Sequence, residues 1–203
     1  MRFNKYFILI LGTIALLGAS FCYYANNSTP AEEQVVRIGD NASSQLLKTL
    51  KLNLSKAIKE KGLVGALNYC NENAFLLTDS VEKQLPDGVM IKRTSFRTRN
   101  MINEPDDDEI KIMKWFENQK AINNGLPDHY VQIRNYGTYK YYNYYKPLVI
   151  EGMCLNCHGE PNIMNPGVVK KIRELYPNDR AMGYKLGDLR GVVHVTIPAN
   201  LVE

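Results

Sequence analysis

Cysteine and histidine are scarce in this chain, which contains four Cys and three His among 203 residues. A structural zinc site usually combines two pairs of these residue types at close spacing. The chain offers only one close pair, Cys154 and Cys157, so a complete zinc site is not indicated. The other Cys and His residues, apart from the His158 that follows the pair, stand alone: Cys22, Cys70, His129 and His194.

Excess charge is also small. The formal net charge is +4 and includes Arg2 and Lys5, so the chain without its N-terminal segment carries about +2. This is too little to predict nucleic-acid binding. The sequence also shows no Ser-His-Asp set, phosphate-binding loop or site for a metal-bound water, and with two His besides His158 a peroxidase pocket has few candidates. We therefore do not expect an enzyme.

The close cysteine pair belongs to the sequence Cys154-Leu155-Asn156-Cys157-His158. C-x-x-C-H is typical of c-type haem attachment, because two thiols can add to the haem vinyl groups while the adjacent imidazole ligates iron. A disulfide between the two thiols, or half of a zinc site, is the alternative. We predict one covalent haem c, with His158 as an axial ligand.

The N-terminus has the features of an export signal. Arg2 and Lys5 precede an apolar run over residues 7–17, and residues 17–19 are suited to cleavage. The apolar stretch 6–24 also approaches the roughly 18 to 20 residues of a membrane span. We expect residues 1–25 to be a signal peptide or a membrane anchor. The protein would then be exported to the bacterial periplasm or the outer face of the inner membrane.

Residues 26–43 are expected to form a tether and the start of the first helix, and residues 44–203 a single domain. Helical spacing of apolar residues predicts a helix that ends at Gly62, and a second helix follows directly. Strands are predicted at 89–96, 130–134, 139–145 and 191–197, and helices begin near Pro105 and at residue 168. Lys146-Pro147 is expected to end the third strand. The pattern predicts an α+β domain with N-terminal helices, then an antiparallel meander with a helical insertion.

Cys70 is the odd thiol of the domain once the motif is assigned to haem. Ala66, Leu67, Cys70 and Ala74 form one apolar stripe on the second helix, so we expect the thiol to be buried. An unpaired buried Cys is often only a small hydrophobic core residue. The stripe alone therefore leaves open whether Cys70 is a ligand.

Several motifs in order resemble the family of exported c-type haem domains with a PAS-like fold. They are A-L-N-Y-C ending at Cys70, R-T-S-F-R-T-R-N at 93–100, N-E-P at 103–105, C-L-N-C-H-G-E-P at 154–161, Y-P at 176–177 and G-D-L-R-G at 187–191. The likeness runs from about residue 44 to 198. Members occur as free-standing proteins and as sensory inputs of bacterial histidine kinases and chemoreceptors. The resemblance implies an antiparallel PAS-like sheet and haem ligation by His158 and Cys70.

Other sixth ligands are conceivable, and the propionates need partners. The competing ligands are Met153, Met164, Met182, His129 and His194. Because arginine forms bidentate pairs with carboxylates, we expect Arg93 or Arg97 to contact a haem propionate.

Two functions are compatible with a single haem. A thiolate ligand favours ferric iron and a low reduction potential, which predicts a redox or diatomic-gas sensing module for CO or NO. The alternative is an electron-transfer cytochrome in the periplasm or anchored at the membrane, since no output domain follows the last strand. Either role needs a signalling or electron-transfer protein partner, which the sequence does not identify.

Overall fold

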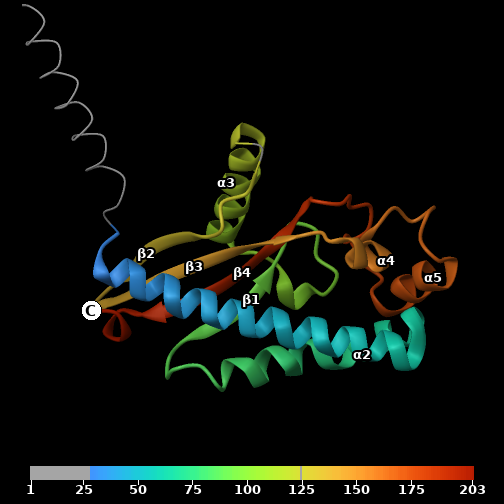
Figure 1. Ribbon diagram of the computed structural model, residues 1–203, viewed down its shortest axis with the longest axis horizontal. Coiled ribbons are helices and arrows are strands. Elements are labelled where there is room, and N and C mark those ends of the chain that lie inside the picture. Colours follow the sequence, from blue (N-terminus) through green and yellow to red (C-terminus); the bar gives the residue numbers. More distant parts are fainter. Residues whose placement is uncertain (1–27, 124) are drawn as a thin grey trace, which may run out of the picture.

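The computed structural model describes residues 28–123 and 125–203. The expected leader at residues 1–25 lies outside the described residues. Elements are labelled as in Figure 1. Within the described part of the chain, no helix is both long enough and apolar enough to cross a membrane.

A long helical element opens the described chain. α2 (Pro30–Glu82) is interrupted at Gly62, whose φ of 66° and ψ of 178° are not helical. The chain reverses direction there (Figure 1), and Tyr69 Oη donates to Asn53 Oδ1 across the two halves at 3.0 Å. The predicted break between two helices is therefore confirmed. Glycine suits this position because a side chain is strained at positive φ.

The start of α2 lies early in residues 26–43, where a tether and the start of the first helix were expected. Thr29 caps the helix, and Thr29 and Glu32 satisfy each other's backbone N–H groups in a capping box. Pro30 follows at the first helical position, which it favours because no hydrogen bond is lost there. A Thr-Pro pair with Glu three residues after the Thr is an N-terminus signature, so helix formation begins earlier than the apolar periodicity indicated.

The four strands form one antiparallel sheet. They are β1 (Met90–Thr94), β2 (Tyr130–Tyr136), β3 (Tyr139–Val149) and β4 (Leu189–Pro198). Their order across the sheet is β1-β4-β3-β2. The hairpin of β2 and β3 is confirmed, but β1 pairs with β4, so the expected meander holds only for β2 to β4. The α+β class is confirmed.

β3 does not end at Lys146-Pro147 as expected. The pairing of β2 with β3 covers Tyr130↔Tyr145 to Tyr136↔Tyr139, whereas the pairing with β4 continues to Val149. Beyond Tyr145, β3 therefore has a free edge. A proline is tolerated on such an edge because its missing N–H removes no ladder bond.

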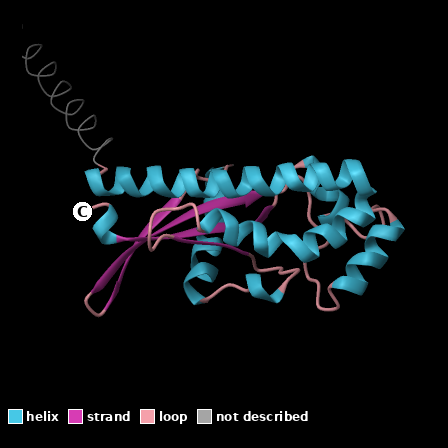
Figure 2. Cartoon of the chain, turned by 90° about the horizontal axis from the view of Figure 1, so that it is seen from below, coloured by secondary structure: helices cyan, strands magenta, loops and turns pink. Residues whose placement is uncertain are grey.

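Helices cover both faces of the sheet (Figure 2). The first half of α2 packs on one face through Val35, Ala42 and Leu46, which meet Tyr144 and alternate valines of β4. α3 (Asp107–Asn123) packs on the other face, where Met113 and Phe116 meet Tyr145 and Val192. This alternation is the period of two that a strand requires. The short helices η1 (Met101–Asn103), η2 (Gly152–Cys154), α4 (Leu155–His158), α5 (Pro166–Leu175) and η3 (Ala199–Leu201) complete the domain.

A buried carboxylate joins α3 to the sheet. Glu109 is fully buried, and it accepts hydrogen bonds from Lys92 Nζ at 2.9 Å and His194 Nδ1 at 2.8 Å. Burial opposes ionisation, but the hydrogen bonds from His194, the Asp106 N–H and Lys92 outweigh it and hold the pKa of Glu109 below its usual range.

A lowered acid pKa stabilises the fold above the unfolded pKa, and this contribution is lost as pH falls through the folded value. Glu109→Gln is therefore expected to lower the free energy of unfolding by about 1 to 3 kcal/mol at pH 7. In this variant the free energy of unfolding should also decrease less steeply than in the wild type as the pH falls below about 4.3. Urea unfolding from pH 7 to pH 3 measures both effects, with the exposed Glu117→Gln on the same helix as control. An acid slope equal to that of the wild type would contradict the assignment.

Candidate functional site

One partly open cavity is lined by most of the predicted site residues. It lies at the end of the sheet near α4, away from the C-terminus (Figure 1), and has a volume of about 280 Å³. Its lining residues come from both halves of α2, from β1, the loop after it and η1, from η2 and α4, from the C-terminal end of α5 and from the start of β4. They are Leu50, Lys51, Leu54, Ile58, Ala66, Leu67, Cys70, Ala74, Arg93, Ser95, Thr98, Arg99, Asn103, Met153, Cys154, Asn156, Cys157, His158, Tyr176 and Arg190.

The C-x-x-C-H motif forms two short helical turns. η2 ends at Cys154 and α4 covers Leu155–His158, so both thiols and the imidazole reach the same cavity. Cys154 packs against Ile150, Ala181 and Tyr184, whereas Cys157 packs against the cluster around Leu67. Both thiols are free and half-buried. The pKa of the Cys157 thiol is raised, mainly because the thiol is partly buried.

His158 is fixed in one tautomer. Its Nδ1 lies 2.6 Å from the carbonyl oxygen of Ala181, and because a carbonyl can only accept, Nδ1 carries the proton. The lone pair of Nε2 is then left for a metal. Burial, followed by the positive charges of Arg99 and Arg190, holds the pKa of His158 well below its usual value. The imidazole is therefore neutral, which is the form that binds metals.

Cys70 lies on the second half of α2 and faces the cavity, as the apolar stripe predicted. It is half-buried rather than fully buried because the cavity, not packed side chains, lies in front of it. Burial raises the pKa of the thiol, and the nearby Arg93 and Arg99 oppose that rise. The structure thus brings Cys70, Cys154, Cys157 and His158 around one space.

The arginines of the R-T-S-F-R-T-R-N run differ in whether they line the cavity. Arg93 lines the cavity, and its Nε is buried without a hydrogen-bond partner in the described part of the chain. Burial and the neighbouring Arg190 lower its pKa. Arg97 is not part of the cavity wall: its Nε donates to Arg180 O at 3.0 Å and its guanidinium stacks on the Tyr184 ring at 4.1 Å. Propionate contact by Arg93 or Arg97 stays a prediction, and of the two only Arg93 lines the cavity.

Arg99 and Arg190 were not predicted as site residues, yet both line the cavity. Arg190 reaches it through an irregularity in the sheet. Leu148 pairs with Gly191 and Val149 pairs with Leu189, so Arg190 has no partner on β3. Such a bulge re-aims a side chain. The G-D-L-R-G run contains this arginine, but periodicity alone does not report a bulge.

Of the competing ligands, only Met153 lines the cavity. Met164 and Met182 pack in the cluster with Leu67, and His194 pairs with Glu109 at α3. His129 stacks on Tyr144 at 5.5 Å.

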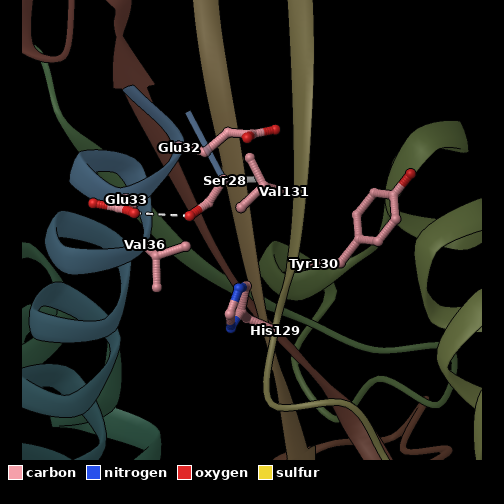
Figure 3. A pocket seen from close by; sticks show the side chains of 7 residues that line it. All are labelled: Ser28, Glu32, Glu33, Val36, His129, Tyr130 and Val131. Atoms are coloured by element: carbon pink, nitrogen blue, oxygen red, sulfur yellow. Dashed lines mark hydrogen bonds between the residues drawn. The ribbon is translucent and has the colours of Figure 1, made fainter. Parts of the chain in front are cut away.

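A separate surface pocket contains His129 beside the first turn of α2 and the start of β2 (Figure 3). Within it Ser28 Oγ donates to Glu33 at 2.8 Å. This pocket shares no residue with the cavity around the motif.

Fold and site together define an α+β domain in which a C-x-x-C-H motif and a helix cysteine face one arginine-lined cavity. The chain belongs to the Tll0287-like family, whose model, described as Tll0287, matches residues 23–198. No curated protein matches the chain. It is similar in structure to the crystal structure of the cyanobacterial heme-protein Tll0287, with a TM-score of 0.58 and 22% sequence identity over 84% of this chain and 97% of that chain. This likeness supports the fold.

Proposed function

We propose that this protein binds one haem covalently through Cys154 and Cys157, with His158 and Cys70 as axial ligands, and that it serves as a redox or diatomic-gas sensing module. The observation that carries the proposal is the convergence of these four residues on one cavity. A solved structure of the same fold is that of a heme-protein, which supports the same assignment. Haem supplies an iron that changes oxidation state and binds small gases.

The residues present fit a haem. Leu50, Leu54, Ile58 and Leu67 give the cavity apolar walls, as a macrocycle requires. No acidic residue is among the described side chains that line it, whereas Arg93, Arg99 and Arg190 are. The unpaired Nε of buried Arg93 is a donor in need of an acceptor, which a propionate carboxylate supplies. The volume of about 280 Å³ is just below the roughly 300 to 1,000 Å³ of typical cofactor sites, and the exposed Lys51 and Asn156 leave one side of the cavity open to solvent.

The two proposed axial groups belong to different elements. His158 is held in the motif by its hydrogen bond to Ala181 O, whereas Cys70 lies on the part of α2 that follows the break at Gly62. That part packs through Leu67 against α5. Gain or loss of the Cys70 bond would therefore act on a helix that contacts other elements, which is what a sensor needs to transmit a change.

We also propose export, because haem is attached to such motifs outside the cytoplasm. The full chain, produced in cells with a c-type haem maturation system, is expected to keep its haem on a denaturing gel. Cys154→Ser with Cys157→Ser should lose it, and a chain without residues 1–25 should receive none. The reduced wild type should also change its absorption spectrum under CO.

Three outcomes separate the parts of this proposal. Haem that leaves the wild type on denaturation would overturn covalent attachment. Haem attachment in the chain without residues 1–25 would overturn export. A reduced protein that does not bind CO or NO but exchanges electrons rapidly with a small redox protein would favour the electron-transfer alternative.

A further inference from the structure

A short segment between α5 and β4 lies against the C-terminal end of the motif. We name residues 179–184 the strap. Its Gly183 N–H donates to Gly159 O at 2.8 Å, and its Tyr184 N–H donates to His158 O at 2.9 Å. Ala181 of the strap is fully buried and supplies the carbonyl that accepts from His158 Nδ1. The strap therefore determines the orientation of the imidazole.

The side chain of Arg99 connects the strap to the motif. Its Nη2 donates to Cys157 O at 2.7 Å and lies 3.4 Å from Ala181 O, while its Nε donates to Asp179 Oδ1 at 2.8 Å. The side chains of Arg99 and Asp179 are 12% and 2% exposed, so the ion pair is shielded from water. Because a guanidinium is planar and rigid, one side chain fixes three acceptors relative to one another.

The loop that carries Arg99 is itself attached to the strap. The Arg180 N–H donates to Thr98 O at 2.9 Å, and Arg97 Nε donates to Arg180 O at 3.0 Å. These bonds hold the backbone of the loop and the strap together. They do not reach the motif, whereas Arg99 does.

We infer that Arg99 is a positioning residue for His158 and that, with Asp179, it sets the reduction potential of the bound haem. The inference rests on the proposed function. Arg99 holds the Ala181 carbonyl that orients the imidazole, and an outer partner of this kind tunes a ligating histidine. Arg99 also places a shielded positive charge beside the cavity. Such a charge favours the reduced state, which carries one positive charge fewer, and the Asp179 carboxylate opposes it.

Two substitutions with opposite expected signs test the inference. Arg99→Gln should lower the midpoint potential, so that the oxidised-to-reduced ratio at a fixed potential rises roughly tenfold, equivalent to about 59 mV for one electron. Asp179→Asn should raise the potential while Arg99 stays in place. Arg99→Lys keeps the charge but not the planar fork, so it should restore the potential in part and leave the paramagnetic resonance signal of the oxidised form altered.

Arg180→Gln is the matched control, because it removes an arginine side chain from the same strap. That side chain is 54% exposed and bonds Glu104 and Thr98 rather than the motif. Potentiometric titration of the four variants and the wild type, all matured with haem, gives the comparison. A structural role alone would lower stability in both Arg99→Gln and Asp179→Asn without shifting their potentials in opposite directions.

The outcomes distinguish the inference from the proposed function. A wild type that takes up no haem would overturn the proposed function. Haem-loaded Arg99→Gln and Asp179→Asn that keep the wild-type potential would overturn the inference alone. Should Arg99→Gln not fold, the upward shift in Asp179→Asn decides the question, and its absence counts against Arg99 as a tuning residue.

Discussion

Replacing Cys70 by serine is expected to remove thiolate character from the oxidised absorption spectrum and to raise the midpoint potential strongly. Cys70 faces the cavity that His158 also lines, on the wall formed by the second half of α2. A thiolate donates more charge to ferric iron than a hydroxyl group or water does, so its loss destabilises the oxidised state. Axial ligands span about 0.8 V, and the shift should be a sizeable part of that range. Absorption spectra and a redox titration measure it.

Ala74→Ser is the matched control for this prediction. Ala74 lines the same cavity one helical turn after Cys70, so the control adds a hydroxyl group without removing the thiol. It should keep the wild-type spectrum. An unchanged spectrum in Cys70→Ser would instead identify Cys70 as a core thiol. If Met153→Leu then altered the spectrum, Met153 would be the ligand, because it is the other cavity residue with a sulfur outside the attachment motif.

Apolar periodicity and turn residues predicted the elements of this domain well. Gly62 breaks the helix where it was expected, and the hairpin of β2 and β3 lies where the tyrosine-rich segments indicated. Both signals are local, since each depends on residues within one or two turns of chain. The position of Cys70 on the cavity side follows from the same kind of signal, because one helical stripe contains it.

Contacts between segments far apart in the sequence were harder to predict than the elements themselves. β1 lies beside β4 rather than β2, and the chain between Thr94 and Tyr130 contains α3, so no short turn joins β1 to β2. No local pattern reports which strand edge a segment joins. The same limit applies to Arg190, which enters the cavity through a bulge in the pairing of β4 with β3. Arg99 was visible in the arginine run, but its bonds to the strap depend on residues about 80 positions later.

Gly191 of β4 lies close against the backbone at the end of β1, and Gly191→Ala is expected to destabilise the fold strongly. Gly191 has a φ of 156°, and a Cβ at this position would lie 2.0 Å from the carbonyl oxygen of Thr94. Backbone atoms cannot move aside as a flexible side chain can, so the strand pair must separate. Backbone strain of about 1 to 3 kcal/mol and overpacking of about 1 to 3 kcal/mol act together, so the free energy of unfolding should fall by about 2 to 6 kcal/mol.

Gly137→Ala separates the two causes. Gly137 also has positive φ, at 62°, but a Cβ there meets nothing within 4 Å. In Gly137→Ala the free energy of unfolding should therefore fall only by the conformational cost of about 1 to 2 kcal/mol. Urea unfolding of both variants makes the comparison, and equal losses would show that the close approach to Thr94 is relieved at little cost.

The effect of Gly191→Ala should extend to the cavity. Gly191 follows Arg190, and Ser95 Oγ on the loop after β1 donates to Arg190 O at 2.6 Å. A Cβ that pushes β1 away from β4 therefore also separates the elements that carry Arg93 and Arg190. We expect the Gly191→Ala protein that does fold to retain the proposed covalent haem, since the motif lies elsewhere, but to shift its midpoint potential. A potential equal to that of Gly137→Ala would mean that the arginines do not depend on this contact.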